Sequence, residues 1–105
     1  MPDRNFFQNY RADQIARVTT THTVKPYEQL ILLTNGTYTV TLPKISESAG
    51  QLFVFVQDGT GTNSITITDA GDDALLTDQI INAQAEQVVL FNNGVCWSVL
   101  HGQTT

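Results

Sequence analysis

Residues 30–42 read LILLTNGTYTVTL and contain the pattern that decides the fold. Residues 30–33 are apolar throughout, whereas residues 37–42 alternate threonine with Tyr, Val and Leu. Alternation with a period of two is typical of a strand with one buried and one solvated face. Between the two runs, Asn35 and Gly36 supply the positive φ angles that a two-residue hairpin turn requires. This stretch therefore predicts two antiparallel strands joined by a tight turn.

Further strands are predicted along the rest of the chain. Turn-forming residues separate short runs of β-branched and apolar residues, and a second Asn-Gly pair lies at Asn93 and Gly94. The predicted strands are residues 18–24, 27–34, 37–42, 51–57, 64–68, 87–92 and 95–100. Residues 44–50 fit one helical turn or a loop, and residues 74–86 fit a short strand or an irregular crossover. We therefore expect an all-β fold, an antiparallel β-sandwich or jelly-roll-like barrel of about seven short strands.

The composition of the 105-residue chain agrees with a small all-β domain. Charged residues make up only 14%, against about 25% in an average soluble domain. Threonine, which favours strands, is the commonest residue, and the hydrophobic content of 41% is the opposite of a disordered composition. Five Lys+Arg against ten Asp+Glu give a net charge of −5. This charge argues against nucleic acid as a partner, since phosphate binding needs a basic surface.

The charge is unevenly distributed along the chain. Residues 1–25 contain four basic and two acidic residues, whereas residues 26–105 contain one basic and eight acidic residues. We therefore predict an extended N-terminal arm over residues 1–25 and a β-sandwich domain over residues 26–105. The aromatic residues of the arm either cover the bottom of the domain or dock onto another protein. The sequence indicates no membrane span and no signal peptide, so we expect no membrane partner and synthesis in a cytoplasm.

Three of the predicted strands are apolar on both faces. Residues 30–33, 52–56 and 88–91 lack alternation, and a two-layer sandwich has only one interior to bury them in. Surplus side chains at about 1.5–3 kcal/mol each sum to the order of 10 kcal/mol, comparable to the stability of a small domain. The simplest explanation is a homo-oligomer whose interface covers the second face. The alternative is that residues 74–86 and the arm fold over it. The predicted interface residues are Ile31, Leu33, Phe53, Phe55, Val89 and Phe91.

The histidines, serines and cysteine do not indicate a metal site, a catalytic nucleophile or a disulfide. His22 and His101 have no further ligand at a metal-binding spacing, and the serines lack a nucleophile-elbow motif. The single cysteine, Cys96, cannot form an internal disulfide, and its neighbours predict a half-buried strand residue. We therefore expect no enzyme activity and no cofactor.

The acidic residues likewise predict no metal site. Asp69, Asp72 and Asp73, with Asp78 nearby, do not follow the spacing of a calcium-binding loop. Aspartate beside glycine is explained by the chemistry of turns alone.

An aromatic platform for sugar rings is the one ligand site that the residue types suggest. Trp97, Tyr38 and Tyr27 are of the kind that sandwich carbohydrate-binding modules use, although Trp97 lies between apolar neighbours, as a core tryptophan does. A carbohydrate-binding β-sandwich module is therefore the alternative function.

The chain resembles the small β-domains found in virion proteins of tailed bacteriophages. The shared pattern consists of Tyr-x-Val-x-Leu-Pro at residues 38–43, an Ala-Gly turn at residues 49–50 and Asn-Gly-x-x-Trp at residues 93–97. The resemblance covers residues 27–100. Such domains occur in tail fibres, head fibres and capsid decoration proteins. The resemblance implies a trimeric structural protein that assembles in the host cytoplasm and lies on the outer surface of the capsid.

The resemblance also implies a mode of attachment. Because the chain stops at Thr105 without the repeats of a long fibre, we expect a capsid decoration or head-spike protein, with a tail or neck fibre component as the alternative. Its partners would be further copies of itself and the major capsid protein or another virion protein. Apolar anchors and arginines of the arm would contact the shell. The predicted attachment residues are Arg4, Phe6, Phe7, Tyr10, Arg11 and Arg17.

Overall fold

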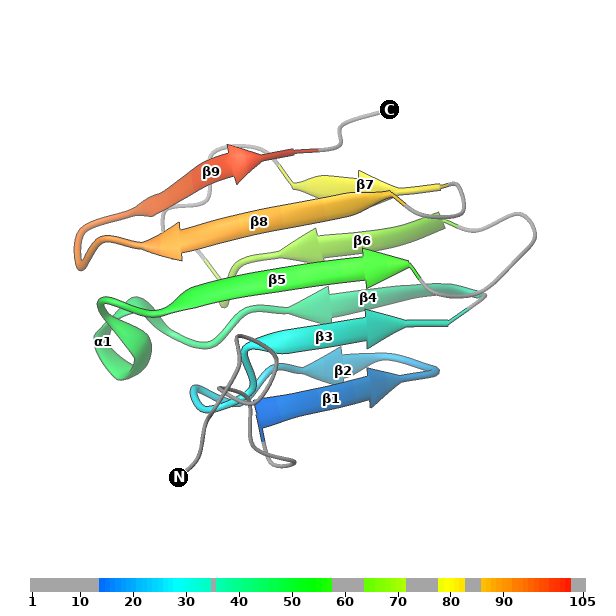
Figure 1. The fold of residues 1–105 in the computed structure, drawn as a ribbon, viewed down its shortest axis with the longest axis horizontal. Helices are drawn as coiled ribbons and strands as arrows, with labels where there is room; N and C mark the ends of the chain where they lie inside the picture. The colour runs from blue at the N-terminus through cyan, green and yellow to red at the C-terminus, as the bar shows by residue number, and fades with distance from the viewer. Residues whose placement is uncertain (1–13, 35, 58–63, 72–77, 83–85, 103–105) are drawn as a thin grey trace, which may run out of the picture.

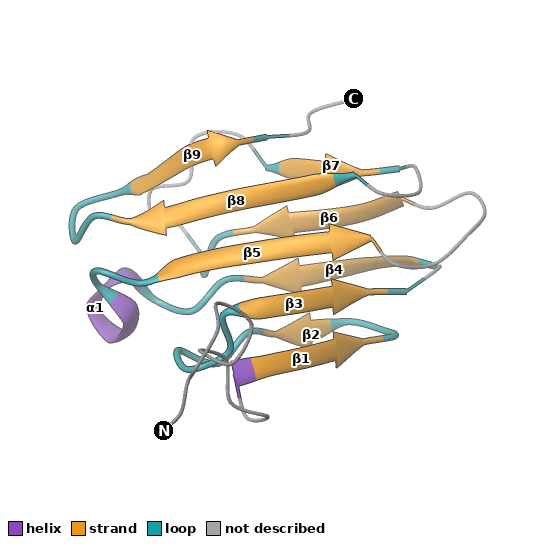
Figure 2. Cartoon of the chain, in the orientation of Figure 1, coloured by secondary structure: helices purple, strands orange, loops and turns teal. Residues whose placement is uncertain are grey.

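The computed structural model describes residues 14–34, 36–57, 64–71, 78–82 and 86–102. Within them, two sheets lie one behind the other (Figure 1). The five-stranded sheet has the order β1 (Ile15–Val18), β3 (Leu30–Leu33), β5 (Leu52–Gln57), β8 (Gln87–Asn92), β9 (Trp97–His101). The four-stranded sheet has the order β2 (His22–Thr23), β4 (Thr37–Thr41), β6 (Ser64–Thr68), β7 (Gln79–Ile81). One helical turn, α1 (Ile45–Ser48), links β4 to β5 (Figure 2). The predicted all-β sandwich is confirmed, but the described residues form nine strands where about seven were expected, and four of the seven strand pairings are parallel and not antiparallel.

Over its first six strands the chain passes back and forth between the two sheets. Strands β1, β3 and β5 belong to one sheet and β2, β4 and β6 to the other, so each coil of chain adds one strand to each sheet. Within each sheet these strands pair in parallel (Figure 1). The first part of the sandwich is therefore three coils of a flattened solenoid, in which each coil contacts its neighbours.

The antiparallel hairpin predicted around Asn35 and Gly36 is wrong. β3 and β4 lie in different sheets, and Gly36 lies where the chain crosses from one sheet to the other. The φ angle of Gly36 is 149°, far from the left-handed helical values that a type I′ hairpin turn uses. Gly36 is part of a sharp turn between the two sheets. The Asn-Gly pair by itself does not determine which sheet the next strand joins.

Replacing Gly36 with alanine is expected to lower the free energy of unfolding by about 1–3 kcal/mol, because a side chain strains this backbone conformation. The added Cβ would also lie 3.0 Å from Cε2 of Tyr38. That ring is held in place, since its hydroxyl donates to the carbonyl oxygen of Thr34 at 2.7 Å, with the carbonyl oxygen of Val18 as a second acceptor at 3.1 Å. Urea unfolding measures the effect. The matched control is Gly50→Ala, at a φ of 83° with open space around the Cβ; equal losses in both variants would contradict the clash.

Antiparallel pairing enters the described structure with the last three strands. β7 pairs with β6, β8 with β5, and β9 with β8, all antiparallel. The second Asn-Gly pair joins the adjacent strands β8 and β9, so this predicted hairpin is confirmed. In its turn, Oδ1 of Asn93 accepts hydrogen bonds from the backbone N–H groups of Val95 and Cys96, at 2.9 Å each. Such side-chain bonding to the following backbone stabilises the turn.

The predicted boundary between arm and body at residue 25 is also wrong. β1 and β2 pair with β3 and β4 as the first coil of the sandwich, so any arm ends before Ile15. In residues 1–13 two arginines are balanced by two aspartates. The excess of positive charge assigned to the arm comes from Arg17 and Lys25, which belong to the body.

Three glutamines stack across the coils where β1, β3 and β5 begin. Nε2 of Gln14 donates to Oε1 of Gln29 at 3.1 Å, and Nε2 of Gln29 donates to Oε1 of Gln51. The backbone N–H of Gln29 also donates to the carbonyl oxygen of Gln14 at 2.8 Å. Stacked amides favour in-register strands. They help to align the side chains of successive coils in rows.

The core lies between the two sheets and takes alternate residues from each strand. Phe53 and Phe55 of β5 are fully buried there, and Phe53 packs edge-on against Trp97 with the ring centroids 5.6 Å apart. The other buried apolar residues are Ala16, Val18, Val24, Ile31, Leu33, Tyr38, Val40, Leu42, Ile45, Ile65, Ile67, Ile81, Val88 and Leu90. One interior therefore takes one face of each sheet and leaves the two outer faces to other surroundings.

Candidate interaction surface

The outer face of the five-stranded sheet carries apolar side chains where a solvated sheet face would carry polar ones. In β1, β3, β5 and β8 the positions between the core residues are half-buried or exposed. Eight of these outward side chains are apolar, and we call them the apolar face: Ile15, Leu30, Leu32, Leu52, Val54, Val56, Val89 and Phe91.

The strand register orders the middle of the apolar face into one row. Ile15 lies opposite Leu30, and Leu30 lies opposite Val54. Val54 in turn lies opposite Val89, which continues the row onto β8. Because neighbouring strands are about 4.8 Å apart, side chains in such a row contact one another. These four residues form an aliphatic stripe across four strands, which we call the central stripe.

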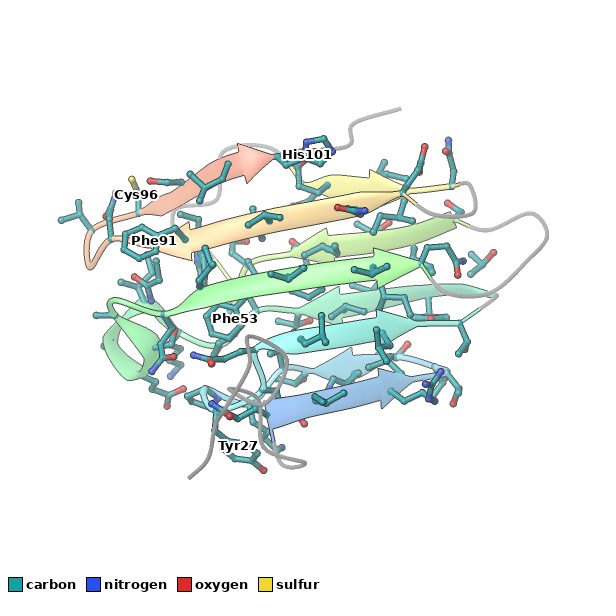
Figure 3. All side chains as sticks on the ribbon, viewed as in Figure 1. Tyr27, Phe53, Phe91, Cys96 and His101 are labelled. Carbon is teal, nitrogen blue, oxygen red and sulfur yellow. The ribbon has the colours of Figure 1, made fainter. Side chains whose placement is uncertain are left out.

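Two shorter rows flank the central stripe. On one side Leu52 lies opposite Phe91, and on the other Leu32 lies opposite Val56. Figure 3 labels Phe91 on β8, near the hairpin that leads to β9. Polar side chains stand where the rows end: Arg17 is opposite Leu32, Gln87 is opposite Val56, and Ser98 is opposite Phe91.

The outer face of the four-stranded sheet has the opposite chemistry. Its positions on β4 and β6 are hydroxyl side chains that alternate with core residues and are half-buried or exposed. In register across the two strands they are Thr37 with Ser64, Thr39 with Thr66, and Thr41 with Thr68. The sandwich therefore has one broad side that is mostly apolar and another that carries hydroxyl groups over β4 and β6.

The predicted oligomer interface is on the wrong face at four of its six positions. Ile31, Leu33, Phe53 and Phe55 point into the core, with an exposed fraction of 0%. Val89 and Phe91 lie on the apolar face. Where both alternating sets of a strand are apolar, a period of two cannot tell which set faces inward.

Only one of the predicted attachment residues lies in the described part of the chain. Arg17 is an exposed residue of β1 at a corner of the apolar face, and thus part of the sandwich. The other five lie outside the described residues: Arg4, Phe6, Phe7, Tyr10 and Arg11.

The three aromatic residues considered for sugar binding do not form an exposed platform. Trp97 is 5% exposed and Tyr38 is 8% exposed, both as part of the core. Tyr27 is 50% exposed and lies in the loop before β3 (Figure 3). The carbohydrate-binding alternative therefore loses two of its three residues.

The histidines lie in different surroundings. Nε2 of His22 is 3.0 Å from Oε1 of Glu28, and the same oxygen accepts a hydrogen bond from the backbone N–H of Lys25 at 2.9 Å. This arrangement ties together the loop between β2 and β3. His101 is exposed on β9. In the part of the chain that the structure describes, no three His, Cys, Asp or Glu residues gather as a metal ion would require.

The remaining single-residue predictions are placed as follows. Cys96 is half-buried, but it lies in the β8–β9 turn and not in a strand. Asp69 and Asp78 lie just after β6 and just before β7, while Asp72 and Asp73 lie outside the described residues. Among the described residues, no helix has both the length and the apolar character needed to cross a membrane.

Comparison with known proteins yields no match to a family model, to a curated protein or to a solved structure. The functional argument therefore depends on the surface chemistry of the sandwich itself.

Proposed function

We propose that the protein is a structural component of a tailed-phage virion. In this role it is a capsid decoration or head-spike protein that self-associates, with a trimer favoured, and that attaches to the shell through the residues before β1. The apolar face is the observation that carries the proposal, because broad apolar patches on folded domains mark protein–protein contacts. The sequence pattern shared with virion β-domains supplies the choice of assembly.

The chemistry of the two outer faces supports a subunit of a larger assembly. A decoration protein needs one side that is covered by neighbours and another that faces water. The apolar face suits the first requirement, and the Thr-rich face of β4 and β6 suits the second.

Deleting residues 1–13 is expected to abolish binding to the virion and to leave the sandwich folded. The deletion stops at Asp13 because β1 pairs with β3, so a longer one would expose the edge of β3. Co-sedimentation of the purified protein with phage heads measures binding, and circular dichroism measures folding. Retained binding by the shortened protein would contradict attachment through this segment.

Two sets of substitutions separate apolar from charged attachment. Alanine at Phe6, Phe7 and Tyr10 together is expected to weaken binding more than alanine at Arg4 and Arg11, since the two arginines of this segment are balanced by two aspartates.

Antibody labelling of virions in the electron microscope gives the position of the protein on the particle. Label on the head surface is expected; label on the tail or neck would instead indicate a fibre component.

A further inference from the structure

We propose that copies of this chain pack their apolar faces against one another, around an axis that runs along the central stripe. The inference rests on the self-association in the proposed function and names the surface that makes it. It replaces the interface expected from the sequence, since four of those six residues are inside the core.

The composition of the apolar face is that of a permanent contact between identical subunits. Of the ten outward positions on β1, β3, β5 and β8, eight are apolar, and the other two are Arg17 and Gln87. Interfaces between permanently associated copies are more apolar than contacts between proteins that associate transiently. A second copy of the chain therefore fits this face better than a transient partner does.

The distribution of charge favours the same partner. The chain has a net charge of −5, and every acidic residue that the structure describes lies outside the strands: Glu28, Glu47, Asp69, Asp78 and Glu86. Copies that meet through the apolar face bring none of these carboxylates into its centre. Contact through the loop ends would bring like charges together at a cost in free energy.

The rows of the apolar face indicate where the axis lies. The central stripe is aliphatic on all four strands and ends at the exposed His101 on β9, and the flanking rows end in Arg17, Gln87 and Ser98. Rotation about the stripe places the Leu52 side of one copy against the Leu32 side of the next. The stripe is then the most buried part, and the polar residues remain at the rim, as interfaces require.

Val54 and Thr66 offer a matched pair of variants for the test. Both are half-buried, outward-facing residues on interior strands, Val54 on β5 and Thr66 on β6 of the opposite sheet. At micromolar concentration we expect the wild-type protein and Thr66→Arg to have the same oligomeric mass by light scattering, and Val54→Arg to have the mass of the monomer. A monomeric wild type, or a Val54→Arg variant that keeps the wild-type mass, would overturn the inference.

Cysteine cross-linking tests the axis without a buried charge that could disturb folding. In a Cys96→Ser background, mild oxidation of Val54→Cys is expected to give covalent dimers on a non-reducing gel, because the residues of neighbouring copies lie beside the common axis. Thr66→Cys is expected to give none. Failure of Val54→Cys to cross-link, or equal cross-linking of the two variants, would refute this arrangement.

These measurements use the purified protein without virions, so their outcome is independent of the attachment test. A protein that cross-links through Val54→Cys but does not bind phage heads would contradict the proposed virion role and keep the interface. A protein that binds phage heads but stays monomeric would contradict the proposed interface and support the virion role.

Discussion

Asn92→Asp is expected to lower the free energy of unfolding by about 3 kcal/mol or more, because it puts a carboxylate where a buried amide donates two hydrogen bonds. Asn92 ends β8 with an exposed fraction of 0%. Its Nδ2 donates to the carbonyl oxygen of Ile45 at 3.0 Å and to Oγ of Ser48 at 2.9 Å. Its Oδ1 accepts from the backbone N–H of Gly94 at 2.9 Å. Aspartate keeps the acceptor and loses both donors.

The position of Asn92 explains why the effect should spread beyond one residue. Oγ of Ser48 in turn donates a hydrogen bond to the carbonyl oxygen of Lys44 at 3.1 Å. The side chain of Asn92 therefore holds α1 against the end of β8. The backbone adds two bonds, from Gly50 N–H to the carbonyl oxygen of Asn92 at 2.8 Å and from Asn92 N–H to that of Gln51 at 3.0 Å. Loss of the amide would loosen the connection between the sheets at this corner.

Asn93→Ala is the control for Asn92→Asp. Asn93 is exposed, and its side chain bonds to Val95 and Cys96 of the turn and to Ser98 of β9, where water can replace the lost partners. We expect it to cost less than about 1 kcal/mol. Urea unfolding followed by circular dichroism at one fixed protein concentration compares the two, since association changes apparent stability. Similar midpoints for both variants would show that the buried amide is not holding this corner.

The sequence predicted β3 to β6 and β8 well because alternation is local, but residues 18–24, predicted as one strand, contain the end of β1 and all of β2, which lie in different sheets. Residues 64–68 and 87–92 match β6 and β8 at both ends, and the one-turn helix fell inside residues 44–50. The pairing of strands is not local, and there the prediction failed. Both Asn-Gly pairs have the same turn chemistry, yet Gly94 closes a hairpin and Gly36 is part of a crossing between sheets. A turn residue fixes a backbone angle and leaves the destination of the next strand to packing.

One sequence feature could have revealed the solenoid. An apolar strand followed by a strand of alternating Thr or Ser occurs at residues 30–41 and again at residues 52–68. Repeats of one structural unit are the mark of stacked coils, but here the loops differ in length, so no fixed period exists. The parallel register of β4 with β6 aligns these two alternating strands residue by residue.

The side of each doubly apolar strand that faces the core could not be predicted from alternation. In β5 the larger side chains, Phe53 and Phe55, are inside, and the smaller Val54 and Val56 are outside. In β8 the large Phe91 is outside, so side-chain size does not give a rule either. What decides is the register against the neighbouring strands, which only the assembled sheet defines.

Phe53→Ala is expected to lower the free energy of unfolding by about 3–5 kcal/mol, because it leaves a cavity whose walls belong to two sheets and cannot collapse. Phe53 is fully buried and its ring meets that of Trp97 at an interplanar angle of 65°. Within the described residues the buried Nε1 of Trp97 has no hydrogen-bond partner, so packing alone holds the indole ring. Near-ultraviolet circular dichroism of Trp97 should therefore weaken in the variant.

Phe91→Ala tests the contribution of the apolar face independently of the core, since Phe91 is half-buried on the outer side of β8. In the monomer it is expected to cost about 1 kcal/mol, because part of the ring is already in water. Its larger effect should be on the concentration at which copies dissociate. Urea unfolding at two protein concentrations measures both quantities: Phe53→Ala should lower the midpoint equally at each, and Phe91→Ala should remove the dependence on concentration. The opposite assignment of effects would mean that Phe53 lies at the interface after all and that Phe91 belongs to the core.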